Sequence, residues 1–338
     1  MTDSKDRVDI PRLRTCIIGA GSIGKLFFGY LAAAGNDVHL VARGEKRHDI
    51  ASRGIEIHLS SSIEIIKVHD VSVIDVVDKI VTLGALDAII IAVKAPDVRG
   101  VIEALRAAPG IDLSRATLVL LQNGIGVEES ARALFPTIPI VRITTDNGAY
   151  SGTGGLVFHT GKGEIHLGFW DGVRRAGSEA IDVRLRDMFT SSGLPATCSK
   201  NIREKVWQKV IVNAGINPVG ALFQVRNGAI LETPELRKIS ERLTSEALAV
   251  ARAGKFVTDF DGQAAVRSVL ERTAGNRNSM LQDRERGRRT EIEFINGAIV
   301  RHGRELGIET PWNEMIVEIM RGFESLPRDT NNPLRFPD

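Results

Sequence analysis

Residues 15–24 read Thr15-Cys16-Ile17-Ile18-Gly19-Ala20-Gly21-Ser22-Ile23-Gly24, and this stretch decides the fold. Its first four residues form a short, largely β-branched run that predicts a buried strand. The apolar periodicity that follows, from Ile23 to Ala34, predicts a helix that stops at Gly35. A G-x-G-x-x-G pattern set between a strand and a helix is the fingerprint of a dinucleotide-binding fold.

The spacing of the three glycines predicts how such a loop would hold a pyrophosphate. Gly19 permits the tight turn, Gly21 lets the backbone approach the ligand, and Gly24 lets helix and strand pack closely. The free N–H groups at the start of the helix, around Ser22 and Ile23, favour an anion. These five residues are therefore predicted to bind the cofactor. The alternative is a purely structural glycine turn in an α/β protein.

The residues after the second predicted strand indicate which nicotinamide cofactor is bound. This strand, 37–41, is followed by Arg43, Lys46 and Arg47. NAD sites usually carry an acidic residue here for the ribose 2′-hydroxyl, whereas arginine suits the 2′-phosphate of NADP(H). Glu45 is also present but lies beyond the strand end. We expect NADP(H), with Arg43 on its phosphate; the alternative is a solvated basic loop.

The rest of the first half alternates between strand and helix patterns. Continuously apolar runs at 88–93, 118–121 and 138–143 are separated by amphipathic stretches at 98–107 and 127–134. This alternation predicts a parallel sheet with helices on both faces. Lys94 and Asn123 each follow one of these strands, where ligands bind in such sheets. The alternatives are a capping lysine and an ordinary Asn-Gly turn.

Composition sets limits on the class of protein. The chain has 338 residues, 43% of them hydrophobic, and a net charge of +2, which suits two folded domains and indicates neither nucleic-acid nor membrane binding. Cys16 and Cys198 offer no disulfide framework, and no apolar run is as long as a membrane span. The polar start of the chain lacks a secretory signal, so we expect a cytoplasmic protein. Residues 1–12 and 327–338 are expected to be flexible tails.

A glycine-rich segment from 148 to 168 contains two histidines on short strand-like pieces. His159 and His166 have no accompanying thiol or carboxylate at a metal-binding spacing, so no metal site is expected. Both are predicted to lie in an antiparallel extension of the sheet. A helix over 182–191 and a strand over 196–199 should close the domain.

Beyond Lys200 the strand patterns nearly vanish and helical periods dominate, at 206–214, 234–253, 262–274, 290–306 and 311–323. The predicted organisation is therefore a Rossmann domain that binds NADP over residues 1–199 and a helical domain for substrate and catalysis over residues 200–338. A cleft between two domains is a favoured place for a small-molecule site. An apolar face of the helical domain would suit a homodimer.

Lys209, Asn213 and Asn217 lie four residues apart and should therefore share one face of a helix that ends at Pro218. Spacing alone is also compatible with a polar stripe that faces solvent. A second polar set favours a site, with Ser279 and Asp283 followed by Glu291 in the helix predicted over 290–306. The intervening basic run 284–289 is expected to be a solvated surface.

Taken together, these motifs resemble those of the ketopantoate reductase (2-dehydropantoate 2-reductase) family over residues 13–326. The resemblance rests on the glycine loop, on segments 93–95 and 122–124, on 207–218, and on Asn278-Ser279-Met280-Leu281-Gln282-Asp283 and Arg289-Thr290-Glu291-Ile292-Glu293-Phe294-Ile295-Asn296-Gly297. It implies a Rossmann domain joined to a helical domain of the 6-phosphogluconate-dehydrogenase type, with catalysis in the cleft.

The resemblance also implies a role for each matching residue. Lys209 would be the catalytic lysine and Glu291 its acidic partner, with Glu291 also near the cofactor. The substrate would be held by Asn213, Asn217, Ser279 and Lys94, and the cofactor by the glycine loop, Arg43, Lys94 and Asn123. The reaction implied is the NADPH-dependent reduction of 2-dehydropantoate in pantothenate and coenzyme A biosynthesis.

Hydride transfer to a ketone builds negative charge on its oxygen, which a lysine ammonium can stabilise and then protonate. Two departures leave the acid open: Asn147 stands where many relatives have histidine, and the chain is longer than compact members. The first alternative is a D-2-hydroxyacid dehydrogenase on the same scaffold, and the basic residues after strand two disfavour its NAD-linked forms. An NADP(H)-binding sensor without catalysis is the alternative from another class, and it leaves the polar set around Lys209 unexplained.

Overall fold

The computed structural model describes residues 12–60, 62–171 and 180–326, and the predicted tails over 1–11 and 327–338 lie outside these ranges. The chain forms two compact units. Unit 1 comprises residues 1–93, 100–121 and 131–200; unit 2 comprises 94–99, 122–130 and 201–338. The segments that follow two strands of the sheet, 94–99 and 122–130, thus belong to the helical unit. Arg12, predicted to lie in the tail, donates a hydrogen bond to the Gly35 carbonyl.

The main sheet of unit 1 has eight strands: β1 (Thr15–Ile18), β2 (Val38–Val41), β5 (Val73–Ile74), β6 (Ala88–Ile91), β7 (Thr117–Leu120), β8 (Ile140–Thr145), β11 (Ile165–Phe169) and β12 (Ala196–Cys198). Their order is β12-β11-β8-β7-β6-β1-β2-β5. The run β5-β2-β1-β6-β7-β8 is parallel throughout, in the strand order of a dinucleotide-binding sheet. The predicted parallel sheet is therefore confirmed, and β11 is the predicted antiparallel addition, paired with β8.

A second sheet pairs two strands that follow α2 (Gly44–Arg53) with two strands of the glycine-rich segment 148–168. It has the order β4-β3-β10-β9 and comprises β3 (Ile55–Leu59), β4 (Ile65–Val68), β9 (Gly148–Ser151) and β10 (Leu156–Gly161). His166 lies on β11 of the main sheet, as predicted, but the placement of His159 was wrong, because β10 pairs with β3 and β9 instead. The alternation of apolar and polar residues alone did not distinguish the two sheets.

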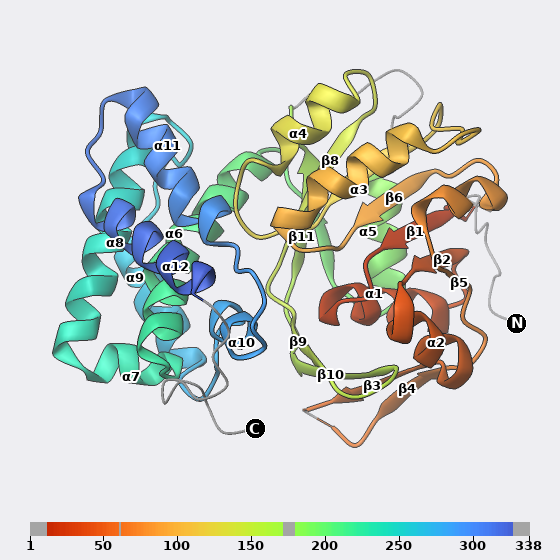
Figure 1. Cartoon of the computed structure of the whole chain (residues 1–338), viewed down its shortest axis with the longest axis horizontal. Helices are drawn as coiled ribbons and strands as arrows, with labels where there is room; N and C mark the ends of the chain where they lie inside the picture. Colours follow the sequence, from red (N-terminus) through yellow and green to blue (C-terminus); the bar gives the residue numbers. More distant parts are fainter. Residues whose placement is uncertain (1–11, 61, 172–179, 327–338) are drawn as a thin grey trace, which may run out of the picture. The chain divides into compact units, whose positions relative to one another are not determined.

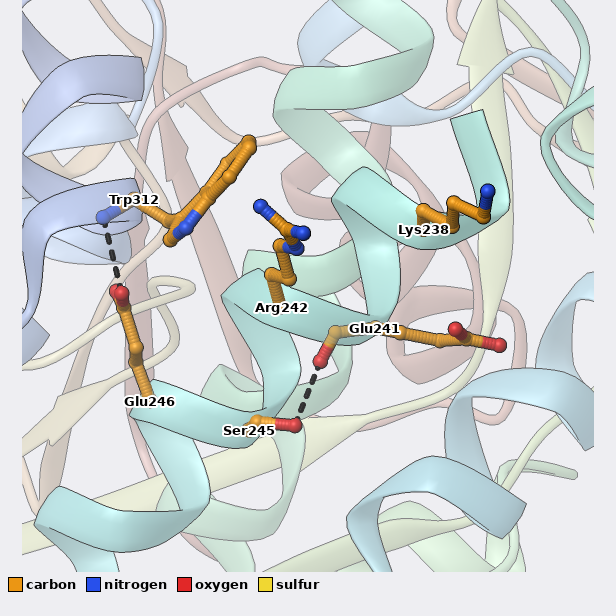
Figure 2. Close-up of a pocket in the computed structure, with 6 residues that line it drawn as sticks. All are labelled: Lys238, Glu241, Arg242, Ser245, Glu246 and Trp312. Carbon is orange, nitrogen blue, oxygen red and sulfur yellow. Dashed lines mark hydrogen bonds between the residues drawn. The ribbon is translucent and has the colours of Figure 1, made fainter. Parts of the chain in front are cut away.

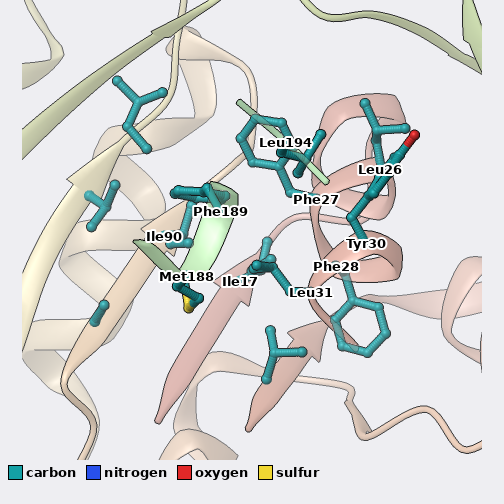
Figure 3. Close-up of a cluster of buried hydrophobic side chains, with 14 of the residues drawn as sticks. Ile17, Leu26, Phe27, Phe28, Tyr30, Leu31, Ile90, Met188, Phe189 and Leu194 are labelled. Carbon is teal, nitrogen blue, oxygen red and sulfur yellow. The ribbon is translucent and has the colours of Figure 1, made fainter. Parts of the chain in front are cut away.

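Six helical segments accompany these strands, and α1 and α5 carry the core of unit 1. The segments are α1 (Ser22–Ala33), α2 (Gly44–Arg53), η1 (Val77–Leu83), α3 (Ala95–Ala107), α4 (Val127–Leu134) and α5 (Ile181–Ser191). Figure 3 shows Phe27 of α1 beside Phe189 of α5, with Ile17 and Ile90 of the sheet in the same cluster. The rings of Phe27 and Phe189 lie 5.3 Å apart. Burial of this apolar surface fixes α1, whose first turn carries the glycine loop.

Unit 2 is helical over the residues from 201 that the structure describes (Figure 1). Its elements are α6 (Ile202–Phe223), α7 (Asn227–Glu232), α8 (Pro234–Ala253), α9 (Gly262–Arg272), α10 (Ser279–Glu285), η2 (Ile292–Phe294), α11 (Asn296–Leu306) and α12 (Pro311–Ser325). The long helix α6 packs against α8 and α10. Among the described residues, no helix has both the length and the apolar character needed to cross a bilayer.

Two local predictions in unit 2 were wrong, and a third held only in part. Pro218 lies inside α6 and does not end it, because α6 is buried on both sides of the proline and tertiary packing outweighs the lost hydrogen bond. The helix predicted over 290–306 is broken into η2 and α11. In the basic run 284–289, residues 286–289 are exposed as predicted, but Arg284 is half-buried: its guanidinium lies over the Phe323 ring and donates to the Leu222 carbonyl. Local patterns do not encode these tertiary contacts.

A buried polar network joins α1 to β10 and includes Asn147. The Asn147 amide nitrogen donates to Thr145 and to the Gly163 carbonyl, so its oxygen accepts from His159 Nε2, 3.0 Å away. His159 Nδ1 is then the acceptor for the Tyr30 hydroxyl, at 2.9 Å. Burial lowers the pKa of His159 below its ordinary value. The folded protein therefore holds this ring neutral.

We expect the replacement His159→Gln to flatten the acid side of the stability curve. In the wild type, the unfolded chain takes up a proton near pH 6.5 that folded His159 resists, so stability is lost as the pH falls below that value. Urea unfolding at pH 7.5 and 5.5 measures the difference. The control His48→Gln lies at an exposed position of α2 and should keep the wild-type difference. An unchanged pH dependence in the His159 variant would contradict this assignment.

Candidate functional site

The glycine loop of unit 1 has the close backbone approaches that the fingerprint requires. Gly19 has φ +120°, and a Cβ there would lie 2.8 Å from the Val93 nitrogen. A Cβ on Gly24 would lie 2.0 Å from the Gly19 carbonyl oxygen. At Gly21 the nearest atom to such a Cβ is the Ala92 oxygen, at 3.9 Å, so the loop is open on this side. The loop thus fits a ligand that approaches the backbone at Gly21.

The first turn of α1 also fits an anion. Gly21 is its N-cap residue and supplies no side-chain cap, so the first backbone N–H groups, around Ser22 and Ile23, face outward from the helix end. The Ser22 hydroxyl lies 3.1 Å from that of Ser151 on β9. These are donors suited to a pyrophosphate, which carries negative charge and no hydrogen-bond donor of its own.

Sequence reasoning missed Lys25, the residue after the last glycine. Its side chain is buried, and the ammonium donates to the carbonyls of Leu156, at 3.2 Å, and Gly154, at 3.4 Å. Burial lowers the pKa of Lys25 to about 8, with a smaller contribution from Lys46. A lysine next to a glycine loop in the sequence gives no signal that it turns inward.

Arg43, the predicted ligand of the 2′-phosphate, is exposed and stands at the N-cap of α2. Lys46 and Arg47 lie exposed in the first turns of this helix, so the basic segment is solvated, as in the alternative, but is helical rather than a loop. Arg43 provides no side-chain cap to the helix. A helix N-terminus and an arginine at one position form a favourable environment for a phosphate dianion.

Four predicted or noted residues of unit 2 meet in one partly buried cluster. Lys94 follows β6, and its ammonium lies 2.6 Å from Asp283 Oδ2 on α10 and 3.6 Å from Glu291 Oε2. Asn123 follows β7 and donates its amide to Glu291 Oε2 at 3.1 Å. The Ala95 backbone N–H donates to Glu291 Oε1 at 3.3 Å. The structure therefore brings together residues from three separate parts of the chain.

The close fit of this cluster depends on Gly124. Its φ is +89°, and a Cβ there would lie 2.3 Å from the Phe294 carbonyl oxygen. The next residue, Ile125, donates its backbone N–H to the same oxygen at 2.8 Å. The Asn123-Gly124 turn is thereby joined directly to the turn that follows Glu291.

The two carboxylates in this cluster are almost fully buried, with side-chain exposures of 5% each, against 38% for Lys94. Burial alone would lower the pKa of Lys94, but Glu291 and Asp283 outweigh it, and the pKa lies above its ordinary value. For Asp283, burial and the nearby Glu291 raise the pKa against the opposing effect of Lys94. The ammonium form of Lys94 is what makes the burial of these carboxylates tolerable.

Glu291 was predicted to lie in a regular helix, but it lies in the turn before η2. Its neighbour Thr290 is buried and donates its hydroxyl to Glu324 of α12 at 2.6 Å, and its N–H to the same oxygen at 2.9 Å. The Ile292 N–H then donates to the Thr290 hydroxyl at 3.3 Å. On the other side, Glu293 pairs with Arg321 of α12. Side-chain bonds to this backbone compete with helix formation and explain the break.

The remaining predicted residues lie on α6 and α10. Lys209, Asn213 and Asn217 occupy successive turns of α6; Asn217 is buried and the other two are half-buried. Ser279 is exposed and begins α10. Their grouping around a substrate and the pairing of Lys209 with Glu291 stay predictions.

Three further asparagines of unit 2 carry buried polar atoms that lack a hydrogen-bond partner within the described ranges: Asn227 Oδ1, Asn278 Nδ2 and Asn296 Oδ1. Such atoms are costly unless a ligand or water satisfies them. Asn278 and Asn296 lie in segments that carry the family resemblance, but the resemblance implies no functional role for them. Nothing in the sequence singles out Asn227. In the same described ranges no group of three or more histidine, cysteine or acidic residues is arranged to hold a metal ion.

A surface hollow of about 330 Å³ lies elsewhere on unit 2, along α8 and the start of α12 (Figure 2). Its wall includes Arg242, whose guanidinium stacks over the Trp312 ring at 4.4 Å. Glu246 accepts hydrogen bonds from the Trp312 and Asn313 N–H groups, both at 2.9 Å, and so caps α12. Arg242 and Glu246 thus hold the start of α12 against α8, and neither belongs to the predicted site.

Comparison with known proteins identifies the family. The model of the family "Ketopantoate reductase PanE/ApbA" matches residues 15–172, and that of its C-terminal part matches residues 201–324. The 2-dehydropantoate 2-reductase of Archaeoglobus fulgidus is 36% identical, over 92% of this chain and 98% of its own. That of Pyrococcus horikoshii is 35% identical, over 93% and 98%.

Solved structures agree with the sequence relatives. A PanE/ApbA family ketopantoate reductase from Ralstonia eutropha superposes with a TM-score of 0.79 at 28% identity, over 92% of this chain and 98% of its own. A D-mandelate dehydrogenase solved with NADH and anilino(oxo)acetate has a TM-score of 0.82 at 26% identity, with the same coverage. From the matched models, relatives and folds together, the chain is an oxidoreductase that belongs to the ketopantoate reductase family.

Proposed function

We propose that this protein reduces 2-dehydropantoate to (R)-pantoate with NADPH, as a step of pantothenate and coenzyme A biosynthesis. The observation that carries the proposal is the partly buried cluster of Lys94, Asn123 and Glu291, at residues that the family resemblance marks as active-site positions. Relatives named 2-dehydropantoate 2-reductase support the reaction. The cluster also disfavours a sensor without catalysis, since such a protein has no need to bury a carboxylate beside a lysine.

The cofactor assignment rests on unit 1. The open approach at Gly21, the uncapped start of α1 and Arg43 at the start of α2 would hold the pyrophosphate and the 2′-phosphate. When bound, NADPH supplies the hydride that the carbonyl carbon accepts. The D-mandelate dehydrogenase structures contain NADH, which supports a nicotinamide cofactor on this fold. Arg43 favours the phosphorylated form here.

The chemistry on the substrate side is assigned to α6 and its partners. Lys209 would donate a hydrogen bond to the ketone oxygen and then its proton, as general acid. Glu291 would favour the ammonium form of Lys209. Asn213, Asn217 and Ser279 would bind the carboxylate and hydroxyl of the substrate, since amides and hydroxyls both donate and accept hydrogen bonds.

A substrate panel tests the reaction. We expect NADPH absorbance at 340 nm to fall fastest with ketopantoate, compared with pyruvate, 2-oxoisovalerate and benzoylformate. A higher kcat/KM for benzoylformate or another acid would favour a D-2-hydroxyacid dehydrogenase; one structural neighbour is named D-mandelate dehydrogenase. Loss of absorbance with none of the four would favour the sensor.

Lys209→Ala should lower kcat by about two to four orders of magnitude, the usual contribution of a general acid. Binding of NADPH, followed by its fluorescence, should change little. The matched control is Lys205→Ala, an exposed lysine one turn earlier on α6, which should keep wild-type turnover. Full activity in the Lys209 variant would remove the central assignment.

Arg43→Ala should weaken NADPH binding about tenfold to a hundredfold, as expected for loss of charge-assisted hydrogen bonds. NADH lacks the 2′-phosphate and should be affected far less. Titration of both cofactors against wild type measures the difference, with Arg53→Ala, in the last turn of α2, as control. Equal losses for the two cofactors would refute the NADP(H) assignment.

A further inference from the structure

Lys94 lies between two carboxylates but is hydrogen-bonded to one of them. Its ammonium is 2.6 Å from Asp283 Oδ2, a short charge-assisted bond, and 3.6 Å from Glu291 Oε2, beyond hydrogen-bond length. Asp283 is therefore the direct partner of Lys94. Nothing in the family comparison or the proposed roles gives Asp283 a task.

Glu291, by contrast, receives its hydrogen bonds in this cluster from neutral groups. The Asn123 amide donates to Oε2 at 3.1 Å and the Ala95 N–H to Oε1 at 3.3 Å. These neutral donors orient the carboxylate, and its charge is offset only in part by Lys94, whose ammonium is 3.6 Å from Oε2. With one ammonium and two carboxylates, the cluster formed by Lys94, Asp283 and Glu291 carries one excess negative charge when all three are ionised.

We propose that Asp283 is a positioning residue that holds Lys94 and thereby reserves the charge of Glu291 for the ammonium of Lys209. This inference rests on the proposed function, because it assigns Lys209 as the general acid. In the wild type, the proton of Lys209 is kept by a carboxylate that Lys94 contacts only at 3.6 Å, because the hydrogen bond to Asp283 holds Lys94 back. Without the charge of Asp283, Lys94 turns to Glu291 as its remaining carboxylate partner and competes with Lys209.

The inference predicts that variants of Asp283 and of Lys94 shift the alkaline limb of the kcat profile in opposite directions. The groups that act on Asp283 are Lys94, Glu291 and the more distant Arg288, and those that act on Lys94 are Asp283 and Glu291. Asp283→Asn removes a negative charge, so the pKa of Lys209 falls and the alkaline limb of the kcat profile moves to lower pH. Lys94→Ala removes a positive charge, so the same limb moves to higher pH.

The experiment measures kcat and KM from pH 6 to 10 for the full chain, with NADPH and the best acid of the panel. Asp283→Asn should lower kcat at pH 8 about tenfold or more while the KM for NADPH stays within about twofold. The control Glu285→Gln lies on the same helix, where its carboxylate pairs with Arg277, and should keep the wild-type profile. Thermal unfolding checks that each variant is folded.

A double-mutant cycle separates positioning from a merely structural role. If Asp283 acts through Lys94, Asp283→Asn should reduce kcat less than twofold further in the Lys94→Ala background. Equal losses in both backgrounds, or alkaline limbs that stay at the wild-type pH in both single variants, overturn the inference. If Asp283→Asn fails to fold, the direction of the shift in Lys94→Ala decides alone. A wild type that oxidises NADPH with no 2-oxo acid refutes the proposed function instead.

Discussion

The contact between the first turn of α1 and the loop before it is the constraint on which the nucleotide-binding unit depends. With a Cβ at position 24 only 2.0 Å from the Gly19 oxygen, no side chain is tolerated there without a shift of backbone. This approach fixes the start of α1 against β1, and the aromatic residues of α1 then fill the space beside α5. The absence of a side chain at Gly24 thus affects both the packing of α1 and the direction in which the free N–H groups of its first turn point.

In unit 2 the main constraint is a different one, the free-energy cost of burying charged side chains. Asp283 and Glu291 are taken almost completely out of water, which is tolerable only because Lys94, Asn123 and a backbone N–H lie against them. These partners come from the segments 94–99 and 122–130, which follow β6 and β7. Both segments therefore belong to unit 2, although they lie in the first half of the chain. Buried apolar residues of the same segments, such as Val98 and Ile125, accompany these polar contacts.

Much of this could be predicted because it is encoded locally. The strand, glycine loop and α1, the parallel run of strands and most helices of unit 2 follow from periodicity and turn residues, as do the positions of Lys94 and Asn123 at strand ends. What failed depended on distant contacts. Pro218 stays within α6 because of its burial, the turn at Glu291 is set by α12, and Lys25 turns inward toward β10. A single sequence contains the residues of such contacts but not their pairing.

The hydrogen bonds from Thr290 to Glu324 have a consequence for biosynthesis. The turn that carries Glu291 is held by a residue 34 positions later, near the end of the last helix that the structure describes. During translation this turn remains without its anchor until α12 has left the ribosome, although the glycine loop has emerged long before. A nascent chain would therefore complete the glycine loop before the turn at Glu291 gains its contact with Glu324.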